Sequence, residues 1–273
     1  MNENAAGPSL MEFLSQRPMV LDSAMGTRLI ALGMSISNDD PALWNLSHPE
    51  AVDSLHQADL VAGSDIIFTN TFGANRDWLA RFGKDAESRE INRRAVDLAR
   101  AARSARHYVV GSIGPGFTHI ASIEEQSEIL EGEGVDAIVF ETFRFDQAVA
   151  ALTAVRPRVE IPLFVSILDW DESIAGQAHQ LEDLGASALG SNCIAGLGRV
   201  AALAERLRSV TRLPILMKPS AGLLDCPAET PRQFGEAATR LFAIGVRMFG
   251  GCCGTTEDHV AEIRKACYDA QTI

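Results

Sequence analysis

Eight short apolar segments recur along the chain at fairly even intervals, and most are continuous rather than alternating with polar residues. Continuous apolar runs are typical of strands that are buried on both faces of a sheet. The pattern therefore predicts strands within residues 19–26, 64–72, 107–114, 135–143, 161–169, 186–193, 214–222 and 246–254.

The segments between these runs carry the spacing of amphipathic helices. Ala51, Leu55, Ala58 and Ala62 would fall on one face of a helix, and residues 91–102 repeat the same spacing. We therefore expect each strand to be followed by a helix.

Local signals predict where several helices begin and end. Ser122 followed by Glu125 has the spacing of a capping box. Thr230 before Pro231 predicts an N-cap with proline at the first helical position. Glycines that would end helices in the left-handed conformation stand before four of the strands, at Gly63, Gly134, Gly185 and Gly245.

Eight strand–helix units in a chain of 273 residues describe a single (β/α)8 TIM barrel. No linker or shift in composition divides the sequence, so we expect one domain over residues 1–273, with residues 1–17 as an N-terminal lead-in. A doubly wound open sheet is the alternative, but that fold usually has fewer strands. It also predicts a phosphate-binding glycine fingerprint after the first strand, which this sequence lacks.

The composition is that of a soluble globular protein, with 47% hydrophobic residues and a formal net charge of −12. This charge disfavours nucleic acids and anionic membranes as partners, because both require basic patches. The N-terminal residues lack the pattern of a signal peptide, and no apolar run approaches the ~20 residues of a membrane span. We therefore expect a cytoplasmic protein whose five cysteines are reduced.

Polar residues stand at the ends of the predicted strands, where a TIM barrel carries its chemistry. Asp22, Glu141 and the pair Asn192–Cys193 end three of these strands, and the pair Cys252–Cys253 ends the last. Three of the five cysteines would therefore meet at one rim of the barrel.

The two adjacent cysteines raise a geometric question, because neighbouring side chains of a regular strand point to opposite faces. The glycines of GGCCGTT, residues 250–256, reach backbone conformations that other residues avoid, so a bend could turn both sulfurs inward. With Cys193 they would form three thiolates around an open fourth position, which is typical of a catalytic zinc site. Core packing and a strained vicinal disulfide are the alternatives. Core packing is the interpretation we favour for Cys226 and Cys267.

Several motifs, in order along the chain, resemble those of the homocysteine S-methyltransferase family: LDSAMGT, DIIFTNTFGAN, GSIGP, FET, GSNC and GGCCGTT. They extend from residue 21 to residue 256 and so span nearly the whole chain. The resemblance implies a zinc-dependent TIM barrel that transfers a methyl group to the sulfur of homocysteine and forms methionine.

The matching positions imply a role for each principal site residue. Cys193, Cys252 and Cys253 correspond to the three zinc ligands, which would hold the homocysteine sulfur in an electron-rich, nucleophilic state. Asp22 and Glu141 correspond to the acids that hold the homocysteine amino group.

Further contacts also follow from the resemblance. The backbone of Ala24, Met25 and Gly26 would bind the substrate carboxylate. Asn192 is a candidate for substrate contact, and a tie between rim loops is its alternative role. Trp44 resembles a tryptophan of family members that use small methyl donors, although a packing role is the alternative.

The methyl donor stays open, because Ser220 stands where the family often has an asparagine. A small sulfonium such as S-methylmethionine, or a betaine-like donor, is the first hypothesis. A separate methylcorrinoid protein is the second. Another thiol or a selenol could replace homocysteine as acceptor. A non-catalytic zinc- or thiol-binding barrel is a further alternative, as is a lyase or aldolase that would use Lys218 as its Schiff-base residue.

Overall fold

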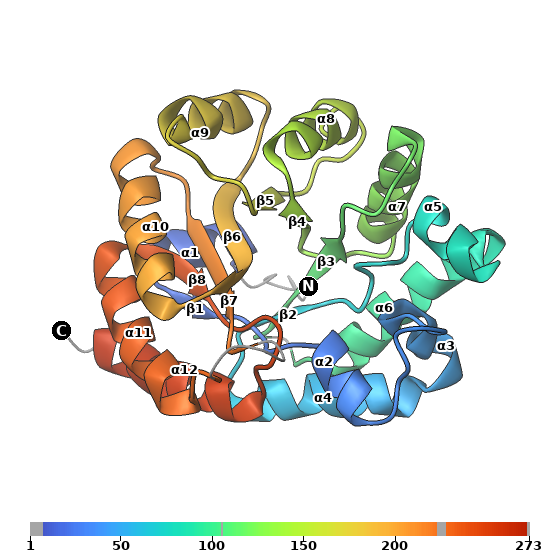
Figure 1. Cartoon of the computed structure of the whole chain (residues 1–273), viewed down its shortest axis with the longest axis horizontal. Helices are drawn as coiled ribbons and strands as arrows, with labels where there is room; N and C mark the ends of the chain where they lie inside the picture. The colour runs from blue at the N-terminus through green and yellow to red at the C-terminus, as the bar shows by residue number, and fades with distance from the viewer. Residues whose placement is uncertain (1–7, 105, 223–227, 272–273) are drawn as a thin grey trace, which may run out of the picture.

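The computed structural model describes residues 8–104, 106–222 and 228–271, and Figure 1 shows its strands at the centre with helices around them. The eight strands form one parallel sheet in the order β1-β8-β7-β6-β5-β4-β3-β2. The strands are β1 (Met19–Val20), β2 (Ile66–Phe68), β3 (Tyr108–Ile113), β4 (Ala137–Phe143), β5 (Leu163–Ile167), β6 (Ala188–Ala195), β7 (Ile215–Ser220) and β8 (Val246–Phe249).

The sheet closes into a barrel between β1 and β2. Leu21 forms a parallel bridge with Ile66, and the Asp65 amide donates to the Val20 carbonyl over 2.8 Å. Every predicted apolar segment contains a strand, and β6 continues two residues beyond its segment, to Ala195. The TIM barrel predicted from the hydrophobic pattern is confirmed.

One long helix follows each strand and packs on the outside of the barrel (Figure 1). These are α4 (Pro49–Ala62), α6 (Ser88–Ala102), α7 (Ile120–Gly132), α8 (Phe145–Val155), α9 (Ile174–Asp183), α10 (Leu197–Val210), α11 (Pro231–Ile244) and α12 (Glu257–Gln271). None of the helices in the described ranges is both long and apolar enough to cross a membrane.

The connections after β1 and β2 carry additional short helices before the long helix begins. The first holds α2 (Gly26–Ala31), η1 (Pro41–Leu43) and α3 (Trp44–Ser47), and the second holds α5 (Arg76–Leu79), η2 (Ala80–Phe82) and η3 (Asp85–Glu87). These segments stand together at one side of the carboxyl-terminal rim in Figure 1. Of these, α2 and η1 contribute Gly26, Thr27 and Pro41 to the lining of the cavity described below.

Most of the predicted helix ends are confirmed. Thr230 is the N-cap of α11, its side chain accepts from the Gln233 amide, and Pro231 is the first helical residue. Gly63 and Gly245 end α4 and α11 in the left-handed conformation, with φ of 113° and 103°. The glycines at 134 and 185 are also left-handed, each directly after the C-cap residue of its helix.

The predicted capping box at Ser122 is wrong. Helix α7 begins at Ile120, so Ser122 lies within its first turn rather than before it. The amides of Thr118 and His119 instead donate to the Asp77 carboxylate, over 2.7 and 2.6 Å. A carboxylate distant in sequence therefore performs the capping that the local pattern had indicated.

Apolar side chains fill the interior of the barrel, and helix α1 (Leu10–Gln16) adds Leu10 and Leu14 to this cluster. Phe13 of the same helix packs edge-on against Tyr108 at the start of β3, so α1 lies against the amino-terminal end of the barrel. Part of the predicted lead-in is thus a structural plug. Cys267 is buried among the helices outside the barrel, as predicted, and Cys226 lies outside the described residues.

Candidate active site

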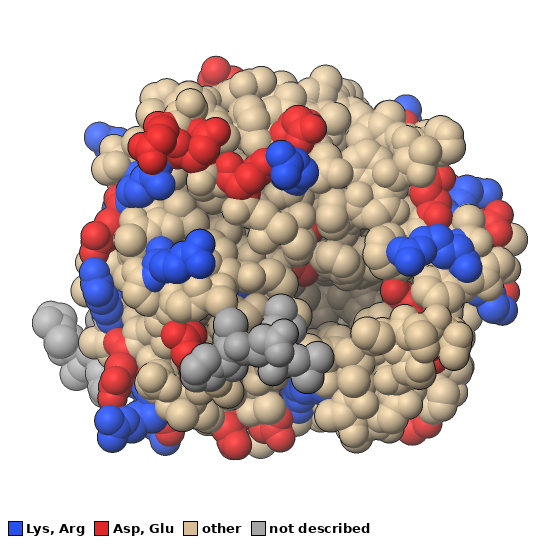
Figure 2. Space-filling model, in the orientation of Figure 1, with Lys and Arg blue, Asp and Glu red and all other residues tan. Residues whose placement is uncertain are grey.

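A cavity of about 270 Å³ opens at the carboxyl-terminal ends of the strands, and the face shown in Figure 2 is hollowed near its centre. The cavity collects nine of the ten predicted site residues, which come from the ends of β1, β4, β6 and β8. They are Asp22, Ala24, Met25, Gly26, Glu141, Asn192, Cys193, Cys252 and Cys253. The tenth, Trp44, does not line it.

Cys252 and Cys253 lie in a turn after β8 rather than in the strand itself. The Gly251 amide donates to the Asp22 carbonyl over 3.0 Å, and the Cys252 amide donates to the Pro219 carbonyl over 2.7 Å. A β-carbon on Gly250 would lie 2.5 Å from that of Leu21, and one on Gly251 would clash with the Thr255 side chain. The glycines therefore permit the backbone approach that bends the chain.

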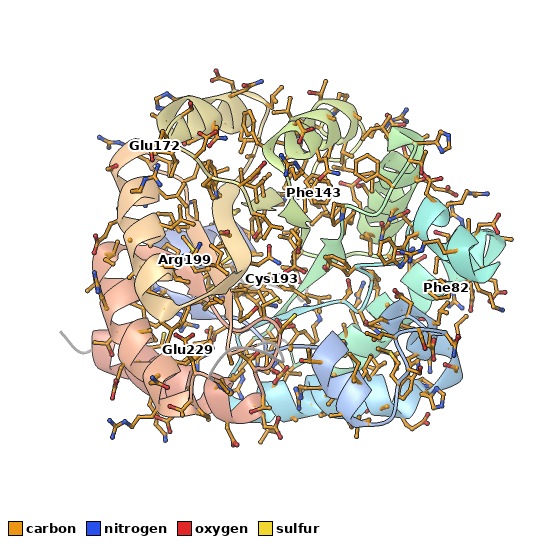
Figure 3. The ribbon with its side chains drawn as sticks, in the orientation of Figure 1. Phe82, Phe143, Glu172, Cys193, Arg199 and Glu229 are labelled. Carbon is orange, nitrogen blue, oxygen red and sulfur yellow. The ribbon has the colours of Figure 1, made fainter. Side chains whose placement is uncertain are left out.

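This turn brings both sulfurs into the cavity, where they meet Cys193 from the end of β6. Figure 3 labels Cys193 near the centre of the ring of helices. The Cys193 sulfur lies 2.6 Å from that of Cys252 and 4.0 Å from that of Cys253. All three sulfurs lie within 4.8 Å of one another, and each residue is partly buried. The predicted meeting of three thiols at one rim is confirmed.

The thiols affect one another's protonation. Hydrogen bonds with Cys252 and Cys253 raise the pKa of the Cys193 thiol. Hydrogen bonds with Cys193 and Cys252 lower the pKa of Cys253, because they stabilise its thiolate. Three soft, closely spaced sulfur donors are chemically suited to zinc.

The two strand ends beside these thiols are irregular. Cys193 and Thr142 have φ of 57° and 64°, the only positive values among non-glycine residues in the described part of the chain. The strand register shifts at both places, after Asn192 in β6 and after Glu141 in β4. Left-handed backbone is rare outside glycine, so these bulges aim the functional side chains at an energetic cost.

Asn192 holds these two bulges together. Its amide oxygen accepts from the Thr142 backbone amide over 2.9 Å and from the Ser166 hydroxyl over 2.6 Å. Its amide nitrogen donates to the Thr142 hydroxyl over 2.8 Å. These contacts match the alternative role considered for Asn192, a tie between neighbouring strand ends.

Asp22 and Lys218, at the ends of β1 and β7 on either side of β8, form a buried ion pair in the cavity. The Lys218 ammonium donates to Asp22 Oδ1 over 2.6 Å, and each side chain is 6% exposed. The Phe68 amide donates to Asp22 Oδ2 over 2.6 Å, and the Phe68 ring lies 4.0 Å from the ammonium. Burial alone would lower the pKa of Lys218, but the carboxylates of Asp22 and Glu141 outweigh it and raise that pKa.

This pairing bears on the lyase or aldolase hypothesis. Schiff-base formation requires a neutral amine, whereas Asp22 holds the Lys218 ammonium in its protonated form. A charged lysine buried in an apolar strand is costly unless an acid pairs with it. The position of Lys218 within an apolar segment was therefore the feature of the sequence that could have indicated this ion pair. Lys218 therefore belongs to the site as the cation of a buried ion pair rather than as a Schiff-base residue.

Glu141 completes the polar wall. The Ser112 hydroxyl donates to Glu141 Oε2 over 2.6 Å. Burial raises the pKa of Glu141 to about 7, although the Lys218 ammonium opposes this shift. A cation that enters the cavity would favour the charged form of this carboxyl group.

The remaining predicted residues divide between the cavity and the surrounding structure. Met25 and Gly26 line the cavity at the start of α2, but the Ala24 amide already donates to the Thr255 hydroxyl over 3.1 Å. Trp44 is buried among apolar residues, stacks on His48 and donates to Asp39 over 2.7 Å. Its placement is that of a packing residue.

Ser220 also lies apart from the thiols. It is 2% exposed at the end of β7, and it lines a neighbouring cavity with Ala195 and Gly222. Its hydroxyl oxygen has no hydrogen-bond partner among the described residues. Serine in place of the asparagine often found in the family thus changes a position next to the main cavity rather than one of its lining residues.

Fold and site together define a TIM barrel with a three-thiol centre and an acidic wall at its carboxyl-terminal rim. A model of the homocysteine S-methyltransferase family matches residues 19–267, and the chain belongs to this family. The family resemblance of the motifs is thereby confirmed.

Comparison with individual proteins agrees with this assignment. The chain is 29% identical to a methionine synthase of Mycobacterium leprae and 30% identical to one of Mycobacterium tuberculosis, over 97% and 94% of its length. It spans only 26% and 25% of those proteins. The metallated form of the homocysteine methyltransferase MmuM from Escherichia coli superimposes with a TM-score of 0.78 at 24% identity. That match covers 92% of this chain and 96% of the other.

Proposed function

We propose that the protein transfers a methyl group from a small activated donor to the sulfur of homocysteine, forming methionine, with zinc bound by Cys193, Cys252 and Cys253. The observation that carries this proposal is the convergence of three thiols within 4.8 Å, in a cavity that also holds Asp22 and Glu141. Family membership makes sulfur methylation the chemistry to test first.

The thiol cluster fits a zinc ion on its donor chemistry. The three sulfurs come from two strand ends and leave one side toward the cavity, as in a catalytic rather than a closed structural site. Zinc held in this way supplies Lewis acidity that deprotonates a thiol at neutral pH.

The residues of the chain would bind and orient the acceptor. The substrate ammonium would favour the charged form of Glu141 and so oppose the effect of burial, which raises the pKa of this group. The backbone at Met25 and Gly26 would meet the substrate carboxylate. Fixing the acceptor at both ends would direct its sulfur toward the donor methyl and remove part of the entropic barrier.

A second candidate is the same acceptor half-reaction with methyl delivered by a separate methylcorrinoid protein. The identity of 29–30% to methionine synthases favours it. The buried position of Trp44 favours it too, because the cavity then lacks the tryptophan that suggested a small donor.

A donor screen tests both candidates. Reduced, zinc-loaded protein is incubated with homocysteine and, separately, S-methylmethionine, betaine and methylcobalamin, and methionine is quantified by mass spectrometry. Methionine from a small donor supports the first candidate, and methionine from methylcobalamin alone supports the second. No methionine from any donor would contradict the methyltransferase proposal and favour a non-catalytic thiol-binding barrel.

A further inference from the structure

The cavity contains an ammonium group of its own. Among the described residues that line it, Lys218 is the only lysine or arginine, and it lies near the end of β7, the strand next to β8. Its nitrogen is 2.6 Å from Asp22 Oδ1, and the pair is nearly inaccessible to solvent. A buried pair of this kind is a fixed part of the site, because separating it would leave a charge without a partner.

We propose that Lys218 sets the acceptor specificity, so that the enzyme also methylates thiol carboxylates that lack an α-amino group. The nearest such acceptor is 4-mercaptobutanoate, which is homocysteine without its amine. The inference rests on the proposed methyl transfer and names the class of acceptor that the same site takes.

Both acids already accept hydrogen bonds from groups of the protein. Asp22 receives hydrogen bonds from the Lys218 ammonium and the Phe68 amide, and Glu141 receives one from the Ser112 hydroxyl. Each acid thus has a donor before any substrate enters. The wall does not depend on a substrate ammonium for its hydrogen bonding.

The expected preference for homocysteine over a thiol without an amine depends on whether Lys218 is present. A site whose buried polar groups are left unpaired by an analogue rejects that analogue by about 10⁴-fold. Two acids without Lys218 would behave in this way toward a thiol that carries no amine. With Lys218 in place, loss of the substrate amine leaves Asp22 paired, so we expect discrimination of about tenfold or less.

The chemical step is the same for both acceptors. The acceptor thiol loses its proton to the solvent, a sulfur–carbon bond forms to the methyl group, and the bond between that methyl and the donor sulfonium breaks. The electron pair of the broken bond leaves with the donor as a neutral thioether. The amine takes no part in this exchange, so only binding and orientation distinguish the two acceptors.

The test compares the two thiols in the wild-type protein and in two variants, with one donor that works for homocysteine. We expect kcat/KM for 4-mercaptobutanoate within about tenfold of that for L-homocysteine in the wild type. Lys218→Met should shift the ratio toward homocysteine by about a hundredfold, because Asp22 then seeks the substrate ammonium. Lys218→Arg keeps a cation beside Asp22 and should preserve the wild-type ratio.

A binding measurement supports the kinetic one and requires neither zinc nor turnover. Metal-free, reduced wild-type protein is titrated with the two reaction products, L-methionine and 4-(methylthio)butanoate, by calorimetry. Dissociation constants within about tenfold support the inference, and this holds even if no donor yields turnover and the proposed function fails. A preference for methionine of about a thousandfold or more, or homocysteine turnover with 4-mercaptobutanoate inert, would overturn it.

Discussion

The acidic wall of the cavity (Asp22, Lys218 and Glu141) and its thiol wall (Cys193, Cys252 and Cys253) differ in whether other residues of the protein supply their hydrogen-bond partners. On the acidic wall, Asp22, Lys218 and Glu141 all have partners at hydrogen-bond distance. On the thiol wall, Cys193 and Cys252 approach each other to 2.6 Å, and their sulfurs have mainly one another as neighbours. The acidic wall is thus paired within the fold, whereas the three thiols of the thiol wall could hold a metal ion.

Backbone strain occurs beside both groups of residues. The left-handed residues are Cys193, itself one of the thiols, and Thr142, which directly follows Glu141, and such conformations cost about 1–3 kcal/mol each. The three hydrogen bonds of Asn192 to Thr142 and Ser166 offset part of this cost. The comparison therefore predicts that substitutions on the acidic wall mainly affect folding, and those on the thiol wall mainly affect metal binding.

The largest effect on stability is expected for Lys218→Met. It leaves Asp22 buried and charged without its cation, so the free energy of unfolding should fall by about 3–5 kcal/mol. Urea denaturation of the metal-free protein measures this. Adding Asp22→Asn removes the orphaned charge and keeps an acceptor for the Phe68 amide, so the double variant should recover most of the loss. A loss below about 1 kcal/mol in the single variant would contradict the division between the walls.

A pH-dependent effect is expected at His56, in α4 behind the acidic wall. Burial lowers the pKa of His56 from its ordinary 6.5 to about 4, although Asp22 opposes the shift. The folded state therefore favours the neutral ring, and this contribution to stability is complete above pH 6.5 and is lost as the pH falls toward 4. Removing the ring with His56→Leu should reduce the acid sensitivity of the unfolding free energy by about 3 kcal/mol over this range.

The matched control is the exposed His179, which is also on a helix. Urea denaturation from pH 7 to pH 4 should give the same slope for His179→Gln as for the wild type, and a flatter slope for His56→Leu. Parallel curves for wild type and His56→Leu would show that His56 does not titrate as its burial predicts.

An intermediate effect is expected for Asn192→Ala. The variant loses three hydrogen bonds and leaves the Thr142 amide unpaired, which should lower the unfolding free energy by about 2 kcal/mol. It should also weaken zinc binding, since Cys193 follows directly in the chain. Unchanged stability and unchanged zinc affinity would show that the bulges hold their shape without this residue.

The smallest effect on stability is expected for Cys252→Ala in the metal-free protein, within about 1 kcal/mol of wild type, because its partly buried sulfur has little packing to lose. Cys267→Ala, on the buried face of α12, should be the more destabilising of the two. Thermal unfolding of both metal-free variants measures the difference. The reverse order would mean that the thiol wall supports the fold.

The sequence predicted the barrel from its apolar runs, and it predicted the thiol cluster because the three cysteines stand at strand ends and within family motifs. Continuous apolar runs define the strands, and the bend at Cys252 follows from the glycines beside it. The Lys218–Asp22 pair was not predicted, because it joins residues 196 positions apart and depends on how the barrel closes. The capping of α7 by Asp77 was not predicted either, because it also joins residues that are far apart in the chain. Trp44 was assigned to the site from its motif alone, and a sequence motif does not determine where a side chain points.

The measurement that tests the thiol centre most directly is the amount of zinc per chain in protein purified under reducing conditions. Wild type, Cys193→Ala, Cys252→Ala and Cys253→Ala are compared, with Cys267→Ala as the control. We predict about one zinc in the wild type and the control, and its loss in the other three variants. No zinc in the reconstituted wild type, or full occupancy after Cys252→Ala, would contradict the assignment of these thiols as a metal centre.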